Sequence, residues 1–256
     1  MGRAVAEAPR VLALRQLGIL RWLERFHVRA FPDGVLVRLL QVRAGMLQEA
    51  ISRGSAFMTR LNAATAALHD DREVFGGRVS WLDYRLYLMR LYGFHAVVEA
   101  ALSGFRPLAT VIADASLRNH KTALLAADLV ALGLDRRDLP QLPRMAFRVP
   151  LALPEALGWT YVVESGTLRS KLLARRLARQ LPEEIQRASA YLGCYGEEAA
   201  TRWRELGDAL DAFAQGQRAA DELACARVID AARDAAIQLR CWVGPVLQPR
   251  TSQRRA

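Results

Sequence analysis

The stretch LNAATAALHDDRE, residues 61–73, reads as one amphipathic helix that carries a single histidine. Leu61, Thr65, His69 and Glu73 recur every four residues, so they are expected to stack along one helix face. The neighbours of His69 are small, which leaves room beside its ring for something flat and large. Glu73 could accept the proton of the second ring nitrogen, as carboxylates do beside metal-bound histidines. A histidine on a helix is more often an ordinary core or surface residue, so the spacing alone leaves both interpretations open.

The composition of the chain predicts an all-α protein. Its 256 residues are 52% hydrophobic, which is enough for a sizeable core. Alanine, leucine, arginine and glutamate dominate, and β-branched residues rarely alternate with polar ones. Glycine and proline gather mostly between the periodic segments, where they would end helices.

The net charge of +10 raises the question of nucleic-acid binding. Residues 1–56 hold nine arginines against four acids, and residues 250–256 hold three arginines and no acid. The rest of the chain has an ordinary charge balance, and its aromatic residues mostly do not interleave with arginine, so no stacking platform is visible. We therefore expect no nucleic-acid partner.

The cysteine pattern favours a reducing, cytoplasmic location. Cys194, Cys225 and Cys241 are odd in number, widely spaced and without a C-x-x-C motif, which argues against a disulfide framework or a zinc site. No apolar run approaches the ~18 residues that span a bilayer, so no transmembrane segment is expected. The N-terminus lacks the uninterrupted apolar core of a signal peptide.

Helical periodicity and capping signals divide the chain into segments. Ser80 is expected to cap a long helix, and Gly104 with Pro107 to end it. Helices are predicted at residues 81–102, 121–132, 155–179, 197–214 and 218–243, with a loop and a short helical piece over 134–155. Two basic helices at 11–30 and 35–52 are predicted to precede them.

The segment 155–179, EALGWTYVVESGTLRSKLLARRLAR, is apolar-periodic on both flanks but contains Glu164-Ser165-Gly166-Thr167 in its middle. Serine and glycine together are a recognised cause of helix kinks, so a kink is predicted there. A glycine at such a place lets the backbone approach another group closely. A kink that only packs against a neighbouring helix explains the pattern equally well.

Four segments, in the same order, resemble segments of the bacterial heme oxygenases. The pattern L-x-x-x-T-x-x-x-H-x-x-x-E at 61–73 is similar to their proximal helix, and LGWTYVVESGTL at 157–168 to their distal helix. KTALLAADLVALG at 121–133 and YG-x(5)-RWRELGDAL at 195–210 resemble the segments that flank the distal helix. The resemblance covers residues 58–242 and implies a heme oxygenase-like multi-helical bundle, with heme held between the two helices.

The resemblance also implies roles for individual residues. His69 falls at the position of the heme-iron ligand, and Glu73 at that of a carboxylate beside it. Arg204 falls at a basic position that contacts a heme propionate, an anion that suits a guanidinium group. At two other such positions, where basic residues are usual, this chain has Asn62 and Asp208.

The distal helix departs from the family pattern as well. Glycines that let the backbone lie close over the heme are usual where this chain has Ser165, Arg169 and Ser170. Gly166 can compensate for the first by a shift of one residue. Nothing compensates for Arg169, whose charge must reach solvent, pair with an acid or a propionate, or block the site. The resemblance implies that Ser165, Gly166 and Arg169 lie in the catalytic distal pocket and that Ser170 contacts the heme.

The resemblance implies an enzyme that cleaves heme with oxygen to biliverdin, carbon monoxide and iron. Heme would be both its substrate and its cofactor. The chain has no G-x-G-x-x-G motif for a flavin or nicotinamide, so an external ferredoxin or flavoprotein reductase is expected as electron donor. The alternatives are a heme- or tetrapyrrole-binding protein without turnover, and a structural or partner-binding protein with an empty pocket. A non-heme di-iron oxidase would need two E-x-x-H motifs, and the chain has one, Glu24–His27.

The expected domain organisation follows from these segments. Residues 1–55 form a basic helical extension, residues 56–248 the heme oxygenase-like domain, and residues 249–256 a disordered basic tail. The four matched segments need nothing from the extension, so we expect the fold to survive removal of residues 1–50.

Overall fold

The computed structural model describes residues 57–66, 75, 77–147, 152–216 and 222–247. All regular structure in these ranges is helical, which confirms the prediction of an all-α protein. The helices predicted at 11–30 and 35–52 and the basic tail lie outside the described residues, so those predictions and the domain boundaries stay untested. None of the described helices is long and apolar enough to cross a membrane.

Helix α4, Trp81–Gly104, begins where the sequence predicts. The Ser80 hydroxyl accepts a hydrogen bond from the backbone N–H of Asp83 at 3.2 Å, and the Asp83 carboxylate accepts one from the backbone N–H of Ser80 at 2.9 Å. This reciprocal capping box satisfies N–H groups that the first turn leaves without partners. Further along, α4 buries His95 and Glu99, an unusual pair for the inside of a helical protein.

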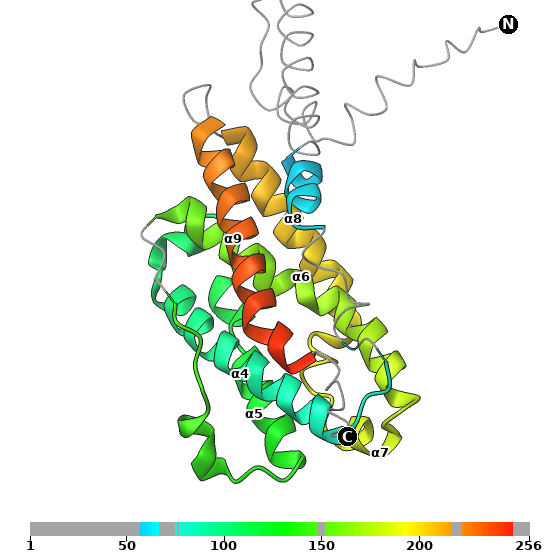
Figure 1. Cartoon of the computed structure of the whole chain (residues 1–256). Helices are drawn as coiled ribbons and strands as arrows, with labels where there is room; N and C mark the ends of the chain where they lie inside the picture. The colour runs from blue at the N-terminus through cyan, green and yellow to red at the C-terminus, as the bar shows by residue number, and fades with distance from the viewer. Residues whose placement is uncertain (1–56, 67–74, 76, 148–151, 217–221, 248–256) are drawn as a thin grey trace, which may run out of the picture. The chain divides into compact units, whose positions relative to one another are not determined.

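Helix α5, Lys121–Ala131, packs against α4 (Figure 1). The chain leaves it through Gly133, whose positive φ of 85° is the left-handed conformation that commonly follows a helix. The buried carboxylate of Asp128 accepts hydrogen bonds from the backbone N–H groups of Ala190 and Tyr191, at 2.8 and 2.9 Å. These bonds fix the position of Tyr191 against α5.

Helices α6, Leu153–Ala178, and α9, Glu222–Leu247, lie against each other (Figure 1). A Cβ atom on Gly158 would lie 2.6 Å from the carbonyl oxygen of Val228 and 2.7 Å from the backbone nitrogen of Ala232. Glycine therefore allows the two helix backbones to approach this closely. α6 stays helical through residues 164–167, where the sequence predicts a kink.

Shorter elements connect the long helices. Helix α8, Ala199–Gly216, follows the 3-10 turn η4, Gly196–Glu198, close to the helix predicted at 197–214. Helix α7, Pro182–Arg187, has no counterpart among the predicted helices because its 6 residues are too few to show a periodic pattern. The other 3-10 turns are η1, Arg106–Thr110, η2, Ala115–Arg118, and η3, Arg136–Gln141.

Candidate functional site

The helix of residues 57–66 is attached to α6 through Tyr161. The hydroxyl of this buried tyrosine donates a hydrogen bond to Oδ1 of Asn62 at 2.6 Å and lies 3.3 Å from the hydroxyl of Thr65. Thr65 also donates to the carbonyl oxygen of Leu61 at 3.1 Å. His69, the predicted iron ligand, lies outside the described residues, four positions beyond Thr65.

The chain returns to α6 after residue 74. The backbone carbonyl of Phe75 accepts a hydrogen bond from the guanidinium group of Arg176 on α6, and the backbone N–H of Val79 donates to the side-chain oxygen of Gln180, just beyond the end of α6, at 2.9 Å. α6 therefore holds both described ends of the segment that contains His69. The two anchors on α6, Tyr161 and Arg176, stand about 22 Å apart along the helix axis.

Both serines predicted at the site lie on α6 between these anchors. The hydroxyl of Ser165 donates to the carbonyl oxygen of Val162 at 2.9 Å, and that of Ser170 donates to the carbonyl oxygen of Gly166 at 2.9 Å. Both serines are buried. Because their hydroxyls fold back onto their own helix, they add little bulk above the backbone.

Gly166 stands beside these serines on a side of α6 that the other described residues leave open. Apart from its chain neighbours and the backbone of α6, the one atom of the described residues within 4 Å of a Cβ built on Gly166 is the hydroxyl oxygen of Tyr191, at 3.9 Å. Contacts among the described residues therefore do not require glycine here. A cradle that a Cβ would partly fill, beside two folded-back serines, fits the close approach of a flat group such as heme.

The other predicted contacts are placed only in part. Arg204 is exposed on α8, and so is Asp208 one turn later. The side chain of Arg169 and the whole of Glu73 lie outside what the structure describes. Burial, and then the charge of Asp208, raise the pKa of the neighbouring Asp211 carboxyl, so this part of α8 does not favour an anion.

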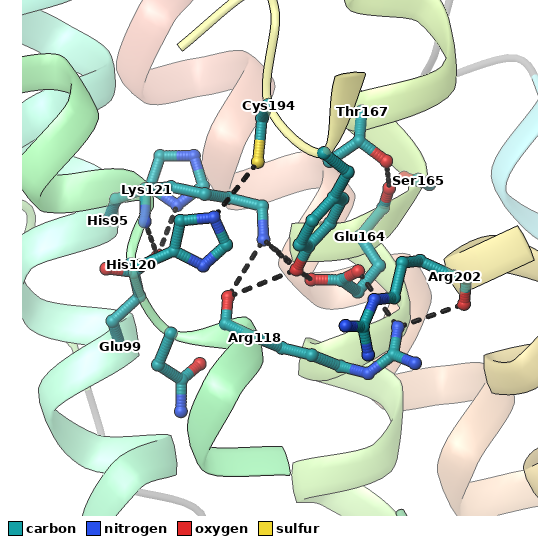
Figure 2. Close-up of polar contacts among 12 residues, drawn as sticks. His95, Glu99, Arg118, His120, Lys121, Glu164, Ser165, Thr167, Cys194 and Arg202 are labelled. Carbon is teal, nitrogen blue, oxygen red and sulfur yellow. Dashed lines mark hydrogen bonds and ion pairs between the residues drawn. The ribbon is translucent and has the colours of Figure 1, made fainter. Parts of the chain in front are cut away.

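Figure 2 shows the carboxylate of Glu164 in the middle of α6, surrounded by donors from other segments. Nζ of Lys121 lies 2.6 Å from Oε1, and Nη1 of Arg118 lies 3.2 Å from Oε2. The hydroxyl of Tyr195 donates to Oε1 at 3.1 Å. Glu164 is 1% exposed, so two cations and a phenol replace the water that its charge has lost.

Arg118 and Tyr195 connect this carboxylate to the surroundings of α6. Arg118 donates to the carbonyl oxygen of Arg202 on α8 at 3.0 Å and pairs with Asp114 at 3.0 Å. Tyr195 has a positive φ of 64°, a left-handed conformation that is uncommon for a tyrosine. Since its hydroxyl bonds to Glu164, the cluster helps to hold this backbone conformation.

A second buried carboxylate lies on α4. Glu99 accepts hydrogen bonds from the backbone N–H groups of Lys121 at 2.8 Å and Thr122 at 3.0 Å, and from the Thr122 hydroxyl at 2.6 Å. One turn earlier, Nε2 of His95 lies 3.3 Å from the hydroxyl of Tyr191. Glu99 thus fixes the start of α5, and His95 reaches the tyrosine that borders Gly166.

A thiol and an imidazole also meet near the cluster. Sγ of Cys194 lies 3.5 Å from Nε2 of His120, and Nδ1 of His120 lies 3.0 Å from the carbonyl oxygen of Leu117. Burial, more than any charge, raises the pKa of the Cys194 thiol to about 11, so the sulfur stays protonated and unreactive at neutral pH. Within the described ranges, no three His, Cys, Asp or Glu side chains are grouped so that they could hold a metal ion.

The buried charge cluster was outside the site predicted from sequence, whose residues are His69, Glu73, Ser165, Gly166, Arg169, Ser170 and Arg204. One signal for it was visible: Glu164 follows the apolar run WTYVV, where an isolated carboxylate would be costly to bury. Its partners carried no local signal. Lys121 is 43 and Arg118 is 46 positions away in the sequence, and no periodicity links them to α6.

Comparison with known proteins agrees with this architecture. The sequence model of the heme oxygenase family matches residues 55–238, and the chain belongs to this family. Its fold is similar to that of the NO- and CO-bound heme oxygenase of Neisseria meningitidis, with a TM-score of 0.58 and 21% sequence identity over 75% of this chain and 92% of that chain. This likeness supports the all-helical fold. A search among curated proteins found no match.

Proposed function

We propose that this chain binds heme between α6 and the segment that carries His69, and that it cleaves heme with oxygen to biliverdin, carbon monoxide and iron. The observation that carries the proposal is the attachment of both ends of that segment to α6, at Tyr161 and Arg176. The open side of Gly166 lies between these anchors. Family membership supports the same function.

The proposed roles divide between holding the heme and shaping its surroundings. His69 would bind the iron, with Glu73 accepting a hydrogen bond from its other ring nitrogen. Arg204, exposed on α8, would pair with a propionate. Bound heme would supply the iron at which oxygen is reduced and the ring that is cleaved. Ser165, whose hydroxyl bonds back to its own helix, and Gly166 would let the backbone of α6 lie close to the heme.

Electrons would come from a separate protein, since the chain lacks a nucleotide-binding motif of its own. We propose a ferredoxin or a flavoprotein reductase as this donor. A cytoplasmic location is proposed from the cysteines, because Cys194, Cys225 and Cys241 form no disulfide.

The iron ligand can be tested by absorption spectroscopy of the full chain with hemin. The His69→Ala variant should lose the spectrum of a histidine-ligated heme, and added imidazole should restore it. His120→Ala is the matched control, because both ring nitrogens of His120 contact other protein atoms, Sγ of Cys194 and the carbonyl oxygen of Leu117. This variant should keep the wild-type spectrum. An unchanged spectrum in His69→Ala would move the ligand to another histidine.

A second candidate function is heme binding without efficient turnover, and Arg169 is the reason. The hydroxyls of Ser165 and Ser170 fold back onto α6, so Arg169 is the one bulky residue among the three that replace family glycines. A guanidinium in the distal pocket would crowd the water that delivers protons. Replacing Arg169 with glycine should then raise the rate of bilin formation. A slower reaction in Arg169→Gly would instead make the arginine catalytic.

A further inference from the structure

A polar path leads from α4 to the open side of Gly166. The Tyr191 hydroxyl borders that side, 3.9 Å from a Cβ built on Gly166, and lies 3.3 Å from Nε2 of His95. His95 is 2% exposed and Tyr191 7%, so the pair lies inside the protein. One end of this buried pair therefore faces the place where we propose that the ligand binds.

The surroundings of Nδ1, the second ring nitrogen of His95, indicate which nitrogen of the imidazole carries the proton. Nδ1 has no hydrogen-bond partner among the described residues and lies 3.8 Å from Oε1 of Glu99, one turn further along α4. Hydrogen bonds from the backbone N–H groups of Lys121 and Thr122 hold that carboxylate in place. A lone pair on Nδ1 would be repelled by the carboxylate, so the neutral ring carries its proton on Nδ1.

Both members of the pair keep their neutral forms. Burial, and then the charge of Lys121, lower the pKa of His95, so the ring carries a single proton. Burial raises the pKa of Tyr191, so the phenol keeps its proton. The other titratable groups that act on Tyr191 are Tyr87, Cys194, Glu99 and Tyr84.

The direction of the hydrogen bond between the two residues follows. With the proton of His95 on Nδ1, the lone pair on Nε2 accepts the hydrogen bond that the Tyr191 hydroxyl donates. The proton of Tyr191 is then directed at His95, and its oxygen keeps lone pairs for a donor on the open side of Gly166. The backbone N–H of Tyr191 bonds to Asp128, which fixes the residue from the other side.

We propose that Tyr191 is the hydrogen-bond acceptor for a water molecule that binds over Gly166, and that His95 and Glu99 are positioning residues that keep the Tyr191 proton turned away from this water. The inference rests on the proposed function and deepens it, because it assigns the polar contact on the ligand side of α6. A neutral acceptor at this place orders water without competing for the protons that oxygen chemistry requires.

The orientation of the pair can be tested without heme, by nitrogen NMR of the imidazole groups in the full chain. At neutral pH His95 should show a protonated Nδ1 and an unprotonated Nε2. Tyr191→Phe should keep this tautomer while changing the Nε2 resonance, because the hydrogen bond to Nε2 is lost. A ring protonated on Nε2, or on both nitrogens, would overturn the inference.

The contact with water can be tested on the hemin complex, by the pH at which its absorption changes from the acid to the alkaline form. This change is the loss of a proton from the water on the iron, which would be the water that donates to Tyr191 over Gly166. Removing an acceptor makes its donor lose a proton more readily, so Tyr191→Phe should lower this pH by about 0.5–1 unit. The control Tyr84→Phe removes a buried hydroxyl that donates to the carbonyl of Ala188, and should leave the transition unchanged. A rise in Tyr191→Phe, or no shift beyond the control, would contradict the proposal.

The positioning role of His95 can be tested on the same transition from the acid to the alkaline form. His95→Leu frees the Tyr191 hydroxyl to turn and should shift the transition in the same direction as Tyr191→Phe. His95→Gln offers an amide oxygen to the same hydroxyl and should stay close to wild type. Equal shifts in both His95 variants would contradict the positioning role.

A wild-type chain that binds no hemin would refute the proposed function itself, whereas hemin binding with an unshifted transition would refute only this inference.

Discussion

Two glycines on α6, Gly158 and Gly166, have the same side chain and opposite surroundings. A Cβ on Gly158 would come within 2.8 Å of the Ala231 side chain and still closer to the backbone of α9. Among the described residues, a Cβ on Gly166 would meet a single hydroxyl, at 3.9 Å. Helix packing requires the first glycine, whereas no contact among the described residues requires the second. The N-terminal half of α6 therefore packs closely against α9, and the described residues leave one side of Gly166 open.

The buried charge cluster of Glu164, Lys121 and Arg118 holds the centre of α6. Breaking this cluster should have the largest effect on stability. Glu164→Gln would leave Lys121 buried without its carboxylate, which should lower the free energy of unfolding by about 4 kcal/mol. Chemical denaturation of the heme-free protein measures this loss. The control Glu155→Gln, on the same helix, removes the half-exposed ion pair with Arg227 and should cost less than about 1 kcal/mol. Equal losses in the two variants would show that the cluster is not what holds α6.

Closing the space at the packed glycine should have the next largest effect. Gly158→Ala would force α6 and α9 apart, since backbone atoms cannot move aside as a side chain can, and should lower the free energy of unfolding by about 3 kcal/mol. Thermal unfolding without hemin measures this change. Full stability in Gly158→Ala would mean that the two helices are further apart than the structure has them.

The same substitution at the open glycine should act in the other direction. Gly166→Ala should raise the stability of the heme-free protein by about 0.5–1 kcal/mol, because alanine favours the helix. It should also weaken hemin binding by about tenfold, as the added methyl group enters the space of the ligand. Parallel hemin titrations and unfolding curves would test both signs. Unchanged hemin affinity in this variant would place the ligand elsewhere on the chain.

Elements governed by local signals could be predicted from the sequence. The capping serine Ser80 fixed the start of α4 to the residue, and Gly133 marked the end of α5, because caps and left-handed glycines act within a few positions. Ser165, Gly166 and Ser170 share one short segment and were named from its resemblance to the heme oxygenases, and their role at a site stays a prediction. These features depend on neighbours in the chain and are visible without the fold.

Features that depend on distant contacts could not be predicted. Glu164 is satisfied by Lys121, 43 positions away, and nothing near either residue announces the other. The sequence likewise cannot distinguish Gly158 from Gly166, since the difference lies in what α9 and Tyr191 place opposite them. Both α6 glycines look like the same helix-weakening residue until the packing is known.

The reaction of the full-length wild-type protein with hemin, a reductant and oxygen tests the proposed function most directly. A histidine-ligated absorption band should form on hemin addition and then decay as a bilin spectrum appears, slowly if Arg169 crowds the distal side. A stable band that neither the reductant nor Arg169→Gly converts to bilin would contradict the proposed cleavage reaction. Failure to form any such band would contradict heme binding over α6 altogether.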